Sequence, residues 1–282
     1  MTDPKPTLEE VTTLLPGVDS AFLAELLEGL PSRYFVDFSQ GAYLAHFRRL
    51  SEISDRRPYE ISVEETTNRR VTVTVLARDY VGVFSILTGL LGSLGLSIKT
   101  GDVYTTGPYH SGTLSGVGGA RRWYRREAGA RRSKPAGPRR FIIDRFEGVR
   151  SEDTAGFAEE AERNIGYALS LLEKNEEAQA RRYTIEQVVQ GLRQGFAGEA
   201  RETQPAQIRF DESEGGMTRV VILAEDTPFF LYTLSTALSF HDVSIEHVEI
   251  RTHRNQVEDS FEIVDSRQRK IEDEGVLNQI RL

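Results

Sequence analysis

The chain has 282 residues, which is enough for two or three small domains, and its 39% of hydrophobic residues can support a core. It has no cysteine, which excludes disulfides and thiolate metal sites, and it has neither a basic, apolar leader nor an apolar run approaching the roughly 20 residues that cross a bilayer, so we expect a cytoplasmic protein. The net charge of −8 is uneven, because eight arginines, one lysine and one glutamate make residues 107–140 +8 and leave −16 for the rest.

Residues 1–57 come before the first predicted strand and have the pattern of a helical connector. Apolar residues recur there at helical spacing between polar turns. The predicted helices are Leu8–Leu15, Ser20–Leu30 and Gly41–Ile53.

Residues 58–205 form the first of two similar segments. Its predicted strands are β-branched and alternating, its helices carry one apolar stripe, and Gly95 ends the first helix. The predicted strands are Glu60–Glu65, Val71–Asp79, Leu96–Thr105 and Phe141–Val149, and the predicted helices are Val81–Leu94 and Asp153–Glu173.

Residues 206–282 repeat this order. Asp79 aligns with Asp226 at an offset of 147 residues, and Asp144 aligns with Asp259 after 32 extra residues in the first segment, which are the basic stretch. So long a period indicates two domains rather than a solenoid. The predicted strands are Gln207–Glu212, Thr218–Glu225, Val243–Thr252 and Gln256–Val264, and the predicted helices are Phe229–His241 and Asp273–Leu282.

Each segment therefore predicts an α+β unit of order ββαββα, which closes into a slightly permuted ferredoxin-like sheet with two helices on one face. Alternatively, Gln207–Glu212 completes the first sheet and Glu60–Glu65 the second. Local hairpins are favoured because they need less loop-closure entropy. Exposed sheet edges predict side-by-side pairing of such units.

The segments Ala77–Phe84, Ala224–Tyr232 and Val257–Phe261 resemble the ACT family of βαββαβ domains. The tandem ACT pair at the C-terminus of bacterial PII uridylyltransferase/uridylyl-removing enzymes is the nearest resemblance, supported also by Leu30–Tyr34 and the last helix. The resemblance covers roughly residues 30–282 apart from the insert.

This resemblance implies small-molecule sensing, usually of amino acids, beside an Asp-x-Pro-Gly loop at the interface of paired domains. Glycine lets a ligand approach the backbone, and the following helix N-terminus offers N–H groups to a carboxylate. The first repeat has Val81 where the family has Pro but keeps Gly82, whereas the second has Phe229 in place of Gly, so the first is the better candidate. The candidate ligand-binding residues are Asp79, Val81, Gly82, Val83, Phe84, Ser97, Asp226, Pro228, Phe229, Phe230 and Ser244.

Simpler roles compete with these. The two loop aspartates are also good helix caps, and the two serines are also ordinary strand residues. The motifs Asp144-x-Phe146 and Asp259-x-Phe261 place each Phe in the core. The histidines form no metal-binding pattern, and His241 and His247 are expected to face solvent, so we predict neither a metal nor a cofactor.

The basic insert, residues 107–140, combines glycines with basic and aromatic side chains that suit phosphates or bases. It lacks the Gly-Lys-Ser/Thr of a P-loop, and its prolines favour a flexible loop. The alternatives are nucleic-acid binding and docking of an acidic protein partner, for which the candidate residues are Arg121, Arg122, Arg125 and Arg126.

No nucleotidyltransferase or phosphohydrolase motif occurs, so we predict no catalytic residue and no enzyme. We expect a homo-oligomeric ACT regulatory protein that senses an amino acid such as glutamine and signals to a partner in nitrogen or amino-acid metabolism, with no membrane or nucleic-acid partner. The alternatives are a degenerate ACT pair that serves as a protein-interaction module, and the regulatory part of a PII uridylyltransferase-like enzyme that lacks its catalytic domains.

Overall fold

The computed structural model describes most of the chain outside the basic insert. The described ranges are 5–107, 140–151, 156–196, 207–212, 216–227, 229–240, 243–253, 256–265 and 269–281. The four arginines proposed for an acidic partner, Pro228 and His241 lie outside them. Among the helices described, none combines the length and the apolar run that crossing a bilayer requires.

Four helices open the chain, and they form a small domain with its own core. Each of the longer ones begins at a polar cap, such as the capping box in which Thr7 N donates to Glu10 Oε2 at 2.7 Å. Their apolar faces pack together and onto Leu76, Tyr104 and Ile143 of the sheet. The helices are α1 (Leu8–Leu14), α2 (Ser20–Gly29), α3 (Tyr34–Asp37) and α4 (Gln40–Ser51).

The first repeat follows in the predicted order, with one additional helix. Its strands are β1 (Tyr59–Glu65), β2 (Arg70–Arg78), β3 (Leu96–Thr105) and β4 (Phe141–Arg150). Its helices are α5 (Val83–Ser93), α6 (Phe157–Glu173) and α7 (Glu177–Arg193). A short 3-10 turn, Thr67–Arg69, lies between β1 and β2. Gly95 has φ +76° directly after α5, as predicted. The sequence reasoning missed α7.

The second repeat has the same order without a counterpart of α7 in the part described. Its strands are β5 (Gln207–Glu212), β6 (Thr218–Glu225), β7 (Ser244–His253) and β8 (Gln256–Val264). Its helices are α8 (Phe230–Phe240) and α9 (Glu274–Arg281).

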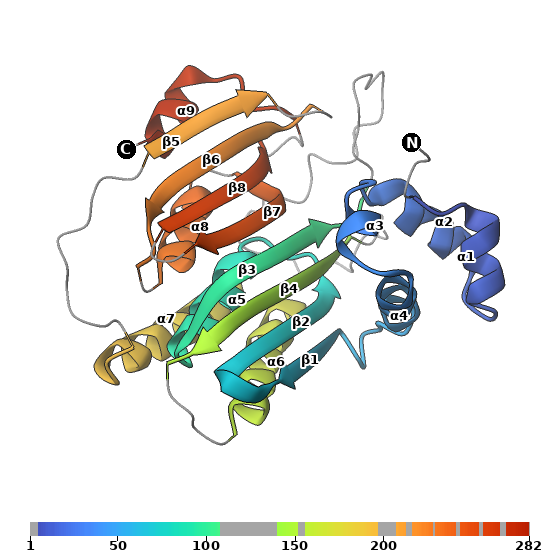
Figure 1. The fold of residues 1–282 in the computed structure, drawn as a ribbon, viewed down its shortest axis with the longest axis horizontal. Coiled ribbons are helices and arrows are strands. Elements are labelled where there is room, and N and C mark those ends of the chain that lie inside the picture. The colour runs from blue at the N-terminus through green and yellow to red at the C-terminus, as the bar shows by residue number, and fades with distance from the viewer. Residues whose placement is uncertain are drawn as a thin grey trace.

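The described strands form one eight-stranded sheet of order β1-β2-β4-β3-β7-β8-β6-β5 with antiparallel neighbours (Figure 1). The local hairpins β1–β2 and β5–β6 are confirmed, and the alternative in which these strands are exchanged between the repeats is wrong. Each half is a permuted ferredoxin-like sheet, as predicted. The side-by-side pairing occurs within the chain, where β3 pairs with β7, and we call this junction the seam.

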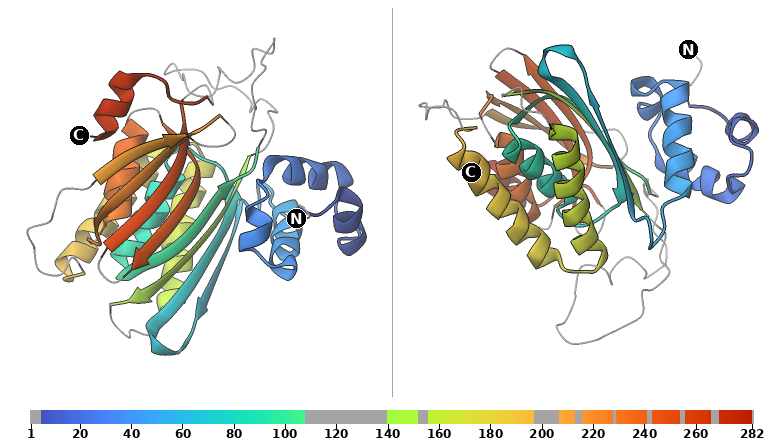
Figure 2. Two further views of the ribbon diagram at one scale, coloured as in Figure 1. Left: turned by 45° about the horizontal axis from the view of Figure 1, so that its top comes forward. Right: turned by 90° about the horizontal axis from the view of Figure 1, so that it is seen from below.

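Helices cover the two faces of the sheet unequally. One face carries α5 to α9, and the other carries α1 to α4 over one end of the first repeat (Figure 2). Alternating residues of β2, among them Val71, Val73 and Val75, point toward α5 and belong to a hydrophobic core that continues into the second repeat. Phe84 of α5 meets Phe261 of β8 edge to face at 6.4 Å across the seam. The two repeats are therefore fused through one core.

Candidate functional site

Two equivalent loop–helix junctions lie at the seam. The first junction, Asp79–Gly82, connects β2 to α5, and the second junction, Asp226–Phe229, connects β6 to α8. They are the loops that the sequence predicts to bind a ligand. Lys99 of the first repeat contacts Asp226 of the second junction, and Glu246 of the second repeat contacts Arg140, which in turn pairs with Asp79 of the first junction, so the seam brings together groups that are far apart in the sequence.

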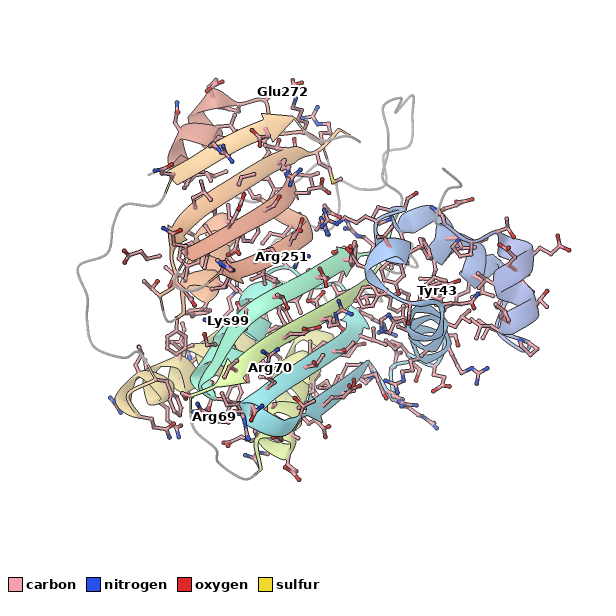
Figure 3. All side chains as sticks on the ribbon, viewed as in Figure 1. Tyr43, Arg69, Arg70, Lys99, Arg251 and Glu272 are labelled. Atoms are coloured by element: carbon pink, nitrogen blue, oxygen red, sulfur yellow. The ribbon has the colours of Figure 1, made fainter. Side chains whose placement is uncertain are left out.

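The contacting residues come from matching irregularities. The pairing register shifts at Lys99 in β3 and at Glu246 in β7, which are equivalent positions in the repeat. A β-bulge turns a side chain away from the regular alternation. Lys99 thereby reaches Asp226 of the second junction, with Nζ 2.5 Å from Oδ2. Figure 3 shows Lys99 where the two repeats meet.

At the first junction the residue that corresponds to Lys99 is Glu246, which is acidic like Asp79, so a third residue supplies the positive charge between them. Arg140, just before β4, lies between the two acids, with Nε 3.4 Å from Asp79 Oδ2 and Nη2 donating to Glu246. Its backbone oxygen also accepts a hydrogen bond from Asp79 N at 3.0 Å. Because the Glu246 side chain is only 4% exposed, removing Arg140 would take an opposite charge away from a buried acid, which is costly.

A glycine shapes the start of α5. Gly82 is the N-cap residue of that helix, with φ +77°, a left-handed conformation that favours glycine. Asp79 therefore precedes α5 without being its N-cap residue. Val83 N donates to Tyr80 O at 3.0 Å, and the other amides of the first helical turn have no intrahelical acceptor, so they are the N–H donors that α5 presents next to Gly82.

An unpaired cation lies beside this glycine. A Cβ placed on Gly82 would lie 3.5 Å from Nη2 of Arg181, which belongs to α7. Arg181 forms no hydrogen bond or ion pair within the described residues. Helix α7 follows α5 in the same direction, since Thr184 lies against Gly89 and Gly191 lies against Ser93. The helix that the sequence analysis missed thus brings a guanidinium to the first junction.

The second junction is filled by its own side chains. Phe229 has φ +61°, and a Cβ placed on Gly92 of α5 would lie 3.0 Å from two carbons of its ring. Tyr232 packs against Gly89 in the same way, at 2.7 Å. The aromatic ring stands where the ACT pattern has a glycine, so this junction is packed against α5 rather than open.

A buried aspartate accompanies each junction. Asp144 of β4 and Asp259 of β8 are equivalent in the repeat, and both are 0% exposed. Neither carboxylate oxygen of Asp144 has a hydrogen-bond partner within the described residues, whereas Asp259 accepts one bond, from Arg251 N at 3.2 Å. The sequence analysis placed Phe146 and Phe261 in the core correctly, but overlooked these acids, although their retention in both repeats was a signal.

Burial perturbs all these carboxyl groups in one direction. Burial raises the pKa of Asp79, against the opposing charge of Arg140. Burial and the charge of Asp79 raise the pKa of Asp144 well above its ordinary value. Burial, with a smaller contribution from Asp226, raises the pKa of Asp259 to about 7, against the hydrogen bond from Arg251 N. Acids that lack partners are stabilised by any cationic group that reaches them.

The other predicted site residues are placed differently. Val83 and Phe84 are buried in the core, and Phe230 packs against it. Val81 is 47% exposed, on the outer side of the loop. Ser97 pairs with Val149 and is exposed on the sheet face away from α5, so it does not join the first junction, and Ser244 is half-buried at the start of β7.

The opposite face of the seam joins the N-terminal helices to both repeats. Arg33 Nη2 lies 2.7 Å from Glu249 Oε2 of β7, and Tyr104 of β3 donates its hydroxyl to Asp37 of α3. His247, which we expected in solvent, is instead 7% exposed with its ring centroid 4.7 Å from that of Tyr104. Pairing of β3 with β7 brings that tyrosine over it, which sequence spacing does not reveal.

Comparisons with known proteins leave the family open. No protein-family model and no curated protein matches the sequence. Among solved structures, the chain is similar to an aspartate kinase from Synechocystis with a TM-score of 0.30 and 10% identity, over 75% of this chain and 25% of that one. The chain therefore spans about a quarter of the length of that kinase.

Proposed function

We propose that the chain is a non-catalytic regulatory protein of the ACT type, which binds an amino acid at the first junction and transmits its binding through the seam. The observation that carries this proposal is the meeting of the left-handed Gly82 with the guanidinium of Arg181, which has no partner within the described residues, at a loop whose Asp79 interacts electrostatically with the buried Asp144. Each of these groups matches one part of a zwitterion.

The carboxylate end of the ligand fits the start of α5. The N–H groups of that helix turn and the positive end of its dipole favour an anion, and Gly82 leaves the backbone accessible. Arg181 supplies a full charge from the neighbouring helix and has no partner to give up within the part of the chain that the structure describes. A guanidinium can hold a carboxylate through two parallel hydrogen bonds.

The ammonium end fits the acids. Asp79 is 28% exposed and stands at the loop, while Asp144 is in β4, and neither of its carboxyl oxygens has a hydrogen-bond partner among the described residues. A ligand ammonium would offset the electrostatic cost of having two carboxyl groups close together in a partly buried site. This pairing favours a zwitterion over a simple anion.

Arg140 provides a route from this junction to the second repeat. It contacts both Asp79 and Glu246, so a ligand ammonium that binds Asp79 competes with it and alters a contact across the seam. We further propose that glutamine is the amino acid and that the partner belongs to nitrogen metabolism, as the resemblance to PII uridylyltransferases implies. On this proposal the chain is regulatory and has no uridylyltransferase activity of its own.

The test is calorimetric titration of the full chain with each of the twenty amino acids. We expect saturable binding of one or a few of them, and we expect Arg181→Gln to weaken it while the melting temperature is kept. Arg182→Gln is the matched control, because Arg182 is exposed one residue away. Absence of binding to all twenty at millimolar concentration rejects the proposal.

A specific observation favours a second function. The second junction is closed by the Lys99–Asp226 ion pair and by Phe229, as expected for a degenerate ACT pair that acts as a protein-interaction module. Under this alternative, protein partners are captured without any amino acid, and deletion of residues 108–139 changes which proteins are retained. Identical partner lists with and without the insert remove its role in docking.

A further inference from the structure

Helix α7 carries an exposed apolar stripe beside its buried face. Its inner face consists of Ala180, Thr184, Val188 and Gly191, which are buried. A Cβ on Gly191 would lie 2.8 Å from Cα of Ser93, so small residues allow this close approach to α5. The helix therefore has a complete packing face before its outer side is considered.

A second apolar stripe runs beside the first. Ile185, Val189 and Leu192 are 51%, 38% and 44% exposed. Their spacing of four and three residues places them on one side of the helix. Exposed hydrophobic residues are ordinary when scattered, but an aligned group indicates a contact surface. Figure 2 shows α7 on the outside of the helix layer, away from the sheet.

Charged residues flank this stripe in a self-complementary order. Glu186 and Arg193 are both exposed, lie seven residues apart on the same side of the stripe, and form no ion pair within the described residues. If a second α7 packs antiparallel about a twofold axis near Val189, Ile185 faces Leu192 of the second copy. The same operation brings Glu186 close to Arg193 of the second copy, and the reverse pair follows by symmetry.

We propose that this surface, Ile185, Val189 and Leu192 with Glu186 and Arg193, binds the α7 of a second copy of this chain in an antiparallel helix pair. The occupant is a second copy because the stripe and its charges complement themselves under a twofold axis. One helix pair buries less than the roughly 1,600 Å² of a standard interface, so the dimer is expected to depend on concentration.

The apolar stripe is tested by sedimentation equilibrium of the full chain over a wide concentration range. We expect the wild type to dimerise and Val189→Asp to weaken the dimer by about 30-fold or more, as for a central interface residue. Val36→Asp is the matched control, because Val36 is 68% exposed on α3, and it should leave the dimer unchanged. Circular dichroism melts confirm that each variant is folded.

The charge pattern is tested by a swap. Glu186→Arg places like charges together in the pair, and Arg193→Glu does so with the opposite sign, so each is expected to weaken the dimer by about fivefold. The double variant restores opposite charges and should recover the wild-type dimer constant. A wild type that stays monomeric at all concentrations, a Val189→Asp dimer of unchanged strength, or a double variant as weak as the singles combined would overturn the proposal.

Discussion

The first and second junctions have the same fold and the same pair of aspartates, yet their surroundings are opposite. At the first, a Cβ on Gly82 would meet nothing closer than 3.5 Å, and Arg181 lies beside it without a partner within the described residues. At the second, Phe229 packs on Gly92, and Lys99 pairs with Asp226. The two junctions are equivalent positions of the repeat. The residue three positions after the aspartate, Gly82 or Phe229, decides whether such a junction stays open or becomes part of the packing between the repeats.

The largest effect we predict concerns the buried aspartate that accompanies each junction, and it is tested at Asp259. The pKa of Asp259 is about 7 in the folded protein and ordinarily 3.8, so the folded state binds its proton more tightly. The contribution of this group to stability is therefore fully present below about pH 4 and is lost as the pH rises through about 7. Asp259→Asn removes this loss and should stabilise the protein at pH 8 by roughly 1 to 4 kcal/mol.

Urea unfolding at several pH values between 4 and 8 measures this change. Asp211→Asn is the control, because Asp211 is exposed on β5, and it should keep the wild-type pH dependence. A variant at Asp259 that retains the full slope would show that this carboxyl group is not the titrating group.

The next prediction removes the difference between the two junctions by filling the first one. Gly82→Val forces a β-branched residue to φ +77° and fills the space at the start of α5, so amino-acid binding should fall by about 100-fold, or roughly 2.7 kcal/mol. Gly195→Val is the matched control, since Gly195 has φ +86° with nothing within 4 Å of a Cβ. Calorimetry should show unaltered binding for the control, and equal losses in both variants would point to strain instead of a site.

The smallest effects compare the two cations of the seam. Arg140 forms ion pairs with Asp79 and with the deeply buried Glu246. Arg140→Met should therefore destabilise the protein by about 2 kcal/mol. Lys99→Met breaks a pair whose side chains are 35% and 20% exposed and should cost about 1 kcal/mol or less. Chemical denaturation at neutral pH ranks the two, and the reverse order would contradict the assignment of Arg140 as the bridging residue.

Local patterns were enough to predict the elements that the two repeats share. Alternating apolar residues at Val71–Asp79 mark a strand, and loop-closure entropy selects the hairpins. The exposed stripe of α7 and its small inner residues Ala180 and Gly191 weaken the contrast between its faces, and no repeat counterpart draws attention to it. For this reason the helix that bears Arg181 escaped sequence reasoning.

The candidate site was predictable only in its loops. Asp79, Gly82 and Phe229 follow from alignment of the repeat, but the contacts of Lys99 and Glu246 depend on bulges and on the pairing of β3 with β7. Those are properties of tertiary structure, in which residues more than a hundred positions apart meet. The retained Asp144 and Asp259 were visible in the sequence as acids at equivalent positions of two strands.

Hydrogen–deuterium exchange with and without a saturating amino acid tests most directly the claim that only the first junction is open. The account predicts slower exchange in the peptide spanning Asp79 to Thr88 and unchanged exchange in the peptide spanning Asp226 to Leu234. Protection at the second junction alone, or equal protection at both, would contradict it.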